Sequence, residues 1–124
     1  IDKEEFQYMG QLLTEGGKAI EYNKEKDEFP LVIGGDHTVA IPSSLASIKK
    51  ENSLGIIWID AHADYNTFET TITGNIHGLP LAAITGYKCN ELRYYHDGKV
   101  IQSSKTVIIG ARNIDSVEKD NILK

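Results

Sequence analysis

Residues 56–80 read IIWIDAHADYNTFETTITGNIHGLP, and the start of this stretch decides the predicted fold. The run Ile56-Ile57-Trp58-Ile59 is apolar throughout and continues from Leu54, as expected for a parallel β-strand that is covered on both faces. Polar residues begin only at Asp60, at the carboxyl end of the strand, where open α/β sheets hold their functional sites. We therefore expect a strand over residues 54–60 that leads directly into a site.

Three polar side chains follow this strand with a spacing of two residues, at Asp60, His62 and Asp64. In an extended segment, side chains at i, i+2 and i+4 lie on the same face, so two carboxylates and an imidazole converge. That arrangement is typical of a metal site. The alternative interpretation is a solvated loop built around an Asx turn.

A second polar cluster follows the apolar residues Phe29-Pro30-Leu31-Val32-Ile33 and reads Gly34-Gly35-Asp36-His37-Thr38. We expect a strand over 31–34, a tight turn at the glycines and a helix from about residue 40. A lone histidine after two glycines is otherwise typical of a turn or of a contact at a helix N-terminus. Because both clusters end predicted neighbouring strands, we expect His37 to reach the same edge of the sheet as Asp60.

The types of candidate ligand bear on the identity of the metal. Carboxylates and imidazole without thiolate favour Mn²⁺, with iron, cobalt or zinc as alternatives. Several carboxylates in one place suggest two ions. A pair of ions roughly 3.5–4 Å apart is a common device for generating a nucleophile at neutral pH.

These two motifs resemble those of the ureohydrolase family, the manganese enzymes that include arginase, agmatinase and formimidoylglutamase. The resemblance is carried by Gly34-Gly35-Asp36-His37-Thr38 and by Asp60-Ala61-His62-Ala63-Asp64. Two further segments are most similar to arginase: Asp64-Tyr65-Asn66 with residues 71–80, TITGNIHGLP, and residues 109–118, IGARNIDSVE. The resemblance implies an arginase-like α/β fold, a three-layer αβα sandwich with a parallel sheet.

The resemblance also implies a role for each matching residue. One manganese ion would be bound by His37 and Asp64, and a second ion by His62. Asp60 would bridge the two ions. The substrate's α-carboxylate would be bound by Asn66, Thr73 and Asn75. Its α-amino group would be bound by Asp115 and Glu118, and His77 would shuttle a proton. Thr73 stands where many arginases have serine, and Ser116-Val117 replaces a more usual Pro-Gly.

The implied reaction is hydrolysis of the guanidinium group of L-arginine to ornithine and urea. Two alternatives stay open: another ureohydrolase, such as agmatinase or formimidoylglutamase, and a non-catalytic fold fragment. The family's further Ser-x-Asp-x-Asp metal motif and its guanidinium-binding acid have no counterpart in the sequence. We therefore expect residues 1–124 to form one partial arginase-like domain, cut at both ends, which is inactive although its parent protein is an enzyme.

Composition excludes several other classes of function. The chain has 124 residues, of which 25% are charged, as is ordinary for a globular protein. Its net charge of −5 argues against nucleic acid or an anionic membrane as a partner. No apolar stretch approaches the ~20 residues that span a bilayer. The single cysteine, Cys89, suits a reducing cytoplasm. The family resemblance further implies a homo-oligomer, a trimer or hexamer.

Strands alternate with helices along the rest of the sequence. The apolar periodicity predicts a helix over about 3–26, with Gly16-Gly17 as a candidate bend. Further helices are expected over 40–50 and about 78–86, another strand over 106–109, and a helix after a cap at Asp115. This alternation predicts a single α/β domain with a parallel sheet.

Overall fold

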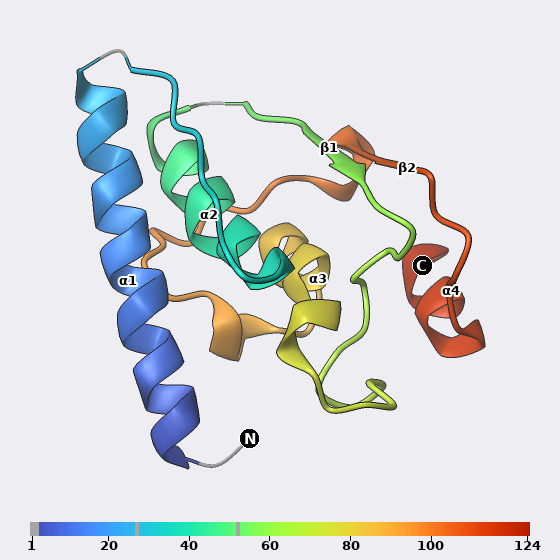
Figure 1. Ribbon diagram of the computed structural model, residues 1–124. Helices are drawn as coiled ribbons and strands as arrows, with labels where there is room; N and C mark the ends of the chain where they lie inside the picture. The colour runs from blue at the N-terminus through green and yellow to red at the C-terminus, as the bar shows by residue number, and fades with distance from the viewer. Residues whose placement is uncertain (1–2, 27, 52) are drawn as a thin grey trace.

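The computed structural model of the protein describes residues 3–26, 28–51 and 53–124. Helix α2 packs against α1 on one side and against α3 on the other (Figure 1). The helices and strands within the described residues are α1 (Lys3–Glu25), α2 (Ala40–Lys50), β1 (Ile56–Ile59), α3 (Pro80–Thr85), β2 (Thr106–Ile109) and α4 (Ser116–Ile122). Short 3₁₀ turns lie between them: η1 (His37–Val39), η2 (Ile76–Gly78), η3 (Asn90–Leu92) and η4 (Ser103–Lys105).

The two strands pair in parallel, from Ile56 opposite Thr106 to Ile59 opposite Ile109. The backbone N–H of Asp60 donates to the carbonyl oxygen of Ile109 over 3.1 Å, so the pairing extends to the first residue of the polar motif. The predicted α/β class with a parallel sheet is therefore confirmed. Both polar segments that follow these strands start from the same edge of the sheet.

Only one face of this sheet is covered within the described chain. Trp58 is 3% exposed and belongs to a core cluster with residues of α2 and α3, whereas its neighbours Ile57 and Ile59 are 67% and 73% exposed. The outward residues of β2, Val107 and Ile109, are exposed beside them. The prediction of a strand covered on both faces is therefore wrong for these residues, because no described element packs on the second face.

The predicted strand over residues 31–34 is also not formed. Residues 29–35 make no backbone hydrogen bond within the described part of the chain, and the side chains of Phe29, Leu31 and Ile33 are exposed. A hollow of about 530 Å³, lined by Val32 among others, separates this segment from the start of β1. The two predicted strands are thus not neighbours, so this segment lacks the partner whose backbone groups a strand requires.

Helix α1 is continuous through the glycine pair at which the sequence suggests a bend. Gly17 is buried against Tyr95: a Cβ atom at this position would lie 2.3 Å from the Tyr95 ring. The glycine therefore permits a close approach between α1 and the loop before β2. It does not mark a break in the helix.

The remaining helices agree with the sequence prediction. Helices α2 and α3 supply half of the buried core cluster, with Ile41, Leu45, Leu81 and Ile84 fully buried. Helix α4 begins after Asp115, whose carboxylate accepts a hydrogen bond from the Glu118 backbone N–H. In the part of the chain that the structure describes, no helix is both long enough and apolar enough to cross a membrane.

Candidate metal and substrate site

The first ligand candidate, His37, lies at the start of η1, just before α2. The carboxylate of Asp36 caps this turn by accepting a hydrogen bond from the Thr38 backbone N–H over 2.8 Å. Neither Gly34 nor Gly35 has a positive φ, so this segment does not contain the predicted tight turn that would require glycine. Gly34 is instead required by packing, because a Cβ atom there would lie 2.1 Å from Cγ1 of Val39.

The second motif leaves the strand by a turn, and the expected extended alternation is therefore not observed. The carboxylate of Asp60 accepts a hydrogen bond from the His62 backbone N–H over 3.1 Å, which is an Asx turn. Asp64 has a φ of 51°, in the left-handed region that non-glycine residues adopt rarely. Its carbonyl oxygen accepts hydrogen bonds from the N–H groups of Leu81 and Ala82 at the start of α3. These contacts hold an unfavourable backbone conformation in place.

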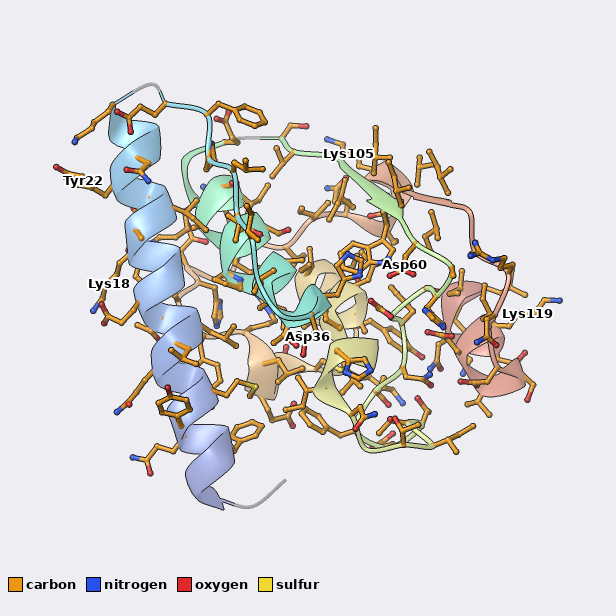
Figure 2. The ribbon with its side chains drawn as sticks, in the orientation of Figure 1. Lys18, Tyr22, Asp36, Asp60, Lys105 and Lys119 are labelled. Atoms are coloured by element: carbon orange, nitrogen blue, oxygen red, sulfur yellow. The ribbon has the colours of Figure 1, made fainter. Side chains whose placement is uncertain are left out.

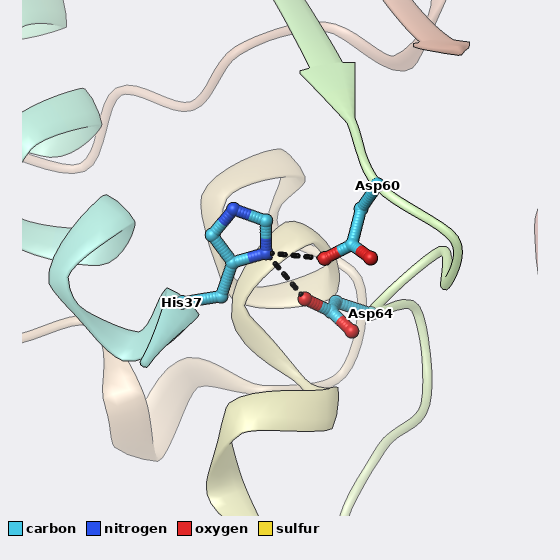
Figure 3. A group of neighbouring side chains, drawn as sticks. All are labelled: His37, Asp60 and Asp64. Atoms are coloured by element: carbon cyan, nitrogen blue, oxygen red, sulfur yellow. Dashed lines mark hydrogen bonds and ion pairs between the residues drawn. The ribbon is translucent and has the colours of Figure 1, made fainter. Parts of the chain in front are cut away.

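Despite this difference in backbone, three of the four predicted ligands converge. The Nδ1 atom of His37 lies 2.9 Å from Oδ2 of Asp60 and 2.9 Å from Oδ2 of Asp64 (Figure 3). One ligand atom from each of the three residues lies within 4.8 Å of the others. In the view of Figure 2, Asp36 and Asp60 lie apart from Lys18 and Tyr22, which are on the outer side of α1. The donor set, one imidazole and two carboxylates around a common point, fits a divalent cation such as Mn²⁺.

The two carboxylates differ in their surroundings. Partial burial raises the pKa of Asp60, but the His62 backbone N–H and the His37 charge outweigh it and hold the pKa below its usual range. Burial dominates at Asp64 and raises its pKa above the usual range, although the hydrogen bond with His37 opposes this. Asp60 is thus held as an anion, and the buried Asp64 is the carboxylate that gains more from a cation beside it.

The fourth predicted ligand, His62, lies on the other side of Asp60. Its Nδ1 atom is 3.3 Å from Oδ1 of Asp60, while its Nε2 atom is 3.2 Å from Nδ2 of Asn113. The two oxygens of Asp60 therefore face two different imidazoles, His37 and His62. A hollow of about 230 Å³ beside these groups is lined by Asp36, His37, Asp60, His62, Asp64 and His77.

The six predicted substrate and proton-transfer residues line a second hollow of about 350 Å³, which also contacts His62 and Asp64. These six residues are Asn66, Thr73, Asn75, His77, Asp115 and Glu118. The structure therefore brings all ten residues singled out by the sequence to two adjoining hollows, and His77 lines both of them.

The acids of the second hollow are already hydrogen-bonded within the chain. The side-chain amide of Asn66 donates to Oδ2 of Asp115 over 2.8 Å. The Tyr65 backbone N–H donates to Oε1 of Glu118, also over 2.8 Å. Burial raises the pKa of Glu118, and the nearby charges of Asp115 and Asp64 raise it further against the opposing Tyr65 hydrogen bond. At Asp115, hydrogen bonds from the Glu118 N–H and Asn66 outweigh the effect of burial and lower the pKa.

Sequence reasoning missed three residues around these hollows. Asn113 contacts His62, Asp36 lines the smaller hollow, and the Trp58 ring lies against His37. Asn113 had a usable signal, since it follows the carboxyl end of the second parallel strand, as Asp60 follows the first. Trp58 had none, because an aromatic residue within an apolar strand is indistinguishable from core in the sequence.

Fold and site together define a parallel α/β protein with an imidazole and carboxylate cluster at the carboxyl edge of its sheet. The chain belongs to the arginase family, whose model matches residues 6–124. It is 44% identical over 105 residues to the arginase of Staphylococcus aureus strain MRSA252, covering 85% of this chain and 34% of that protein. It is 42% identical over 123 residues to the arginase of Bacillus subtilis strain 168, covering 96% of this chain and 42% of that one.

A solved structure supports the same assignment. The crystal structure of arginase from Bacillus cereus superposes with a TM-score of 0.90 at 40% sequence identity, covering 95% of this chain and 42% of that chain. The chain thus spans about 34–42% of the length of these relatives. The predicted family and its arginase-like fold are confirmed.

Proposed function

We propose that this chain carries part of a manganese-dependent active site that hydrolyses the guanidinium group of L-arginine to ornithine and urea. One observation carries the proposal: the two oxygens of Asp60 face His37 and His62, which suits a carboxylate that bridges two cations. In this proposal His37 and Asp64 hold one ion and His62 holds the other. When bound, such ions supply the nucleophile by lowering the pKa of water, and they stabilise developing negative charge.

The chain's own residues bind and orient the amino-acid end of the substrate. The Asn66 amide has two N–H groups and donates one of them to Asp115; the other has no acceptor within the described residues and can donate to a carboxylate. The Thr73 hydroxyl and the Asn75 amide are further donors on the same hollow. Glu118 uses Oε1 to accept from Tyr65, and its Oε2 has no hydrogen bond within the described residues and can accept from an ammonium group. His77 lines both hollows and is positioned in this proposal to give a proton to the leaving amine.

The 124-residue chain alone holds an incomplete set of ligands in this proposal. The ligands assigned in this proposal are two aspartates and two histidines, and the chain spans at most 42% of the relatives named above. We infer that further carboxylates come from a longer protein, which acts in the cytoplasm as a homo-oligomer, and that the isolated chain binds Mn²⁺ weakly and releases no urea.

The test is isothermal titration of the chain with Mn²⁺, alongside assays of urea release from L-arginine and from agmatine. Asp60→Asn should abolish the binding, whereas Asp97→Asn, in an exposed turn, should leave it unchanged. Equal binding by both variants would contradict the metal site. Two ions per chain with urea release from L-arginine would show that the ligand set is complete, for instance within an oligomer. Release from agmatine alone would contradict the assigned substrate.

A further inference from the structure

One aromatic contact lies directly behind the metal cluster. The rings of His37 and Trp58 have centroids 4.1 Å apart, with their planes inclined at 39°. Trp58 is 3% exposed and is the only tryptophan in the sequence. The indole therefore covers one face of the imidazole whose Nδ1 atom lies 2.9 Å from both carboxylates.

The orientation of this imidazole lacks its usual determinant. A histidine that binds a metal through one nitrogen ordinarily donates from the other nitrogen to a carboxylate, a carbonyl or water, and this bond fixes the ring. Nδ1 of His37 faces Asp60 and Asp64, and no hydrogen bond joins Nε2 to any residue that the structure describes. Among the described residues, the ring of Trp58 offers a contact that can set the plane of the imidazole.

Trp58 is itself held firmly. It lies in β1 opposite Ile108, and its side chain is enclosed by the core residues of α2 and α3. Its indole N–H is buried and has no hydrogen-bond acceptor within the described residues. Buried indoles usually find such a partner, so the contribution of this side chain at the site is its flat surface and not its donor group.

We propose that Trp58 is a positioning residue for the metal centre: its indole face fixes the plane of the His37 imidazole and so directs Nδ1 toward Asp60 and Asp64. This inference rests on the proposed metal site. It explains how His37 keeps its orientation although the segment before it forms no strand. Trp58 lies in β1, two residues before Asp60, and its ring contacts His37 in η1, so one segment of the chain carries both a ligand and the group that orients a second ligand.

The first test needs no metal. In the proton NMR spectrum, the imidazole resonances of His37, assigned by their loss in His37→Asn, should be shifted by the ring current of Trp58. Trp58→Phe should keep a smaller shift, since phenylalanine retains a flat ring, and Trp58→Leu should lose it. Identical His37 resonances in the wild type and in Trp58→Leu would overturn the inference.

The second test measures Mn²⁺ affinity by titration. Trp58→Leu should weaken the affinity about 10–100-fold, the usual cost of losing a group that orients a ligand, and Trp58→Phe should restore most of it. Leu92→Ala serves as the control, because Leu92 is fully buried in the same core cluster, so that its truncation lowers stability, and it lines neither hollow of the site. An equal loss of affinity in Leu92→Ala and Trp58→Leu would overturn the positioning role.

A third measurement covers the case in which Trp58→Leu does not fold. Binding of Mn²⁺, which is paramagnetic, should quench the emission of the wild-type chain, whose only tryptophan contacts a ligand. Mn²⁺ that binds without changing this emission would overturn the inference. A wild-type chain that binds no Mn²⁺ contradicts the weak binding proposed for the isolated chain, and the His37 resonances still decide the role of Trp58.

Discussion

Two segments of this chain have the same kind of sequence and different structures. Residues 28–37 run from an apolar stretch into one aspartate and a histidine, and residues 54–64 run from an apolar stretch into a histidine between two aspartates. The second segment forms β1, pairs with β2 and buries Trp58. The first forms no strand within the described chain and leaves Leu31 and Ile33 79% and 86% exposed.

The difference shows that an apolar pattern specifies a strand only where a neighbouring strand is available. β1 has β2 beside it to satisfy its backbone groups, whereas the first segment faces a hollow of about 530 Å³. Yet both segments deliver ligands to one cluster. His37 is located by contacts with Asp64 and Trp58, and these do not depend on strand pairing.

The largest expected effect is a difference in the free energy of unfolding between two leucine-to-alanine variants, one in the buried core and one in the first segment. Leu45 is fully buried in the same cluster as Trp58, so Leu45→Ala should lower the free energy of unfolding by about 2–5 kcal/mol. Leu31 is 79% exposed, and Leu31→Ala should change it by less than about 0.5 kcal/mol. Urea denaturation measures both. A large loss in Leu31→Ala would mean that this segment is buried in solution, which would break the comparison.

The second prediction compares the exposed first segment with the buried core, to which Cys89 belongs, by thiol reactivity. Burial raises the pKa of the Cys89 thiol to about 11, from an ordinary value of 9.0. At pH 8 its thiolate fraction is then about 100-fold lower than in the unfolded chain, so alkylation by iodoacetamide should be slower by at least about that factor. The same shift means that the folded chain loses stability as the pH rises from about 9 to 11, because the folded state holds its proton more tightly.

A matched control places a thiol in the first segment. Ile33→Cys in a Cys89→Ala background should react as fast as the unfolded chain, because position 33 is 86% exposed. Mass spectrometry after timed alkylation gives both rates. Similar slow rates at positions 33 and 89 would show that the first segment is covered.

Much of the fold could be predicted from local pattern alone. The apolar run before Asp60, the periodicity of α2 and the cap at Asp115 each specify an element through neighbouring residues, and each was confirmed. Whether residues 31–34 form a strand could not be predicted from local pattern, because strand formation there depends on a partner strand that is distant in the sequence. Similarly, the sequence suggests that Gly17 bends the helix, whereas the structure shows that Gly17 makes room for the ring of Tyr95.

The candidate site was predictable in its residues and not in its geometry. The residues came from motifs, but the predicted reason for their convergence, an extended alternation from Asp60 to Asp64, was wrong. The chain turns at Asp60 and passes through a left-handed conformation at Asp64, and the start of α3 stabilises that conformation. Contacts that join distant segments, such as Trp58 with His37, leave no periodic signal in a single sequence.

The smallest expected effect separates the two glycines that precede His37. Neither has a positive φ, so conformational strain does not distinguish them. A Cβ atom at Gly34 would lie 2.1 Å from Cγ1 of Val39, a stiff β-branched side chain, whereas a Cβ atom at Gly35 would meet nothing within 4 Å. Gly34→Ala should therefore cost about 1–3 kcal/mol of stability, and Gly35→Ala less than about 0.5 kcal/mol.

Urea denaturation of the two glycine variants, with Mn²⁺ titration beside it, shows where the first segment becomes fixed. Displacing η1 moves His37, so Gly34→Ala should also weaken Mn²⁺ binding, while Gly35→Ala should not. If both variants behave alike, Gly34 does not pack on Val39 in solution, and His37 is held by Asp64 and Trp58 alone. If the two glycine variants differ as expected while Leu31→Ala is neutral, the first segment is fixed only from Gly34 to His37. The exposed residues before Gly34 then contribute nothing to the site.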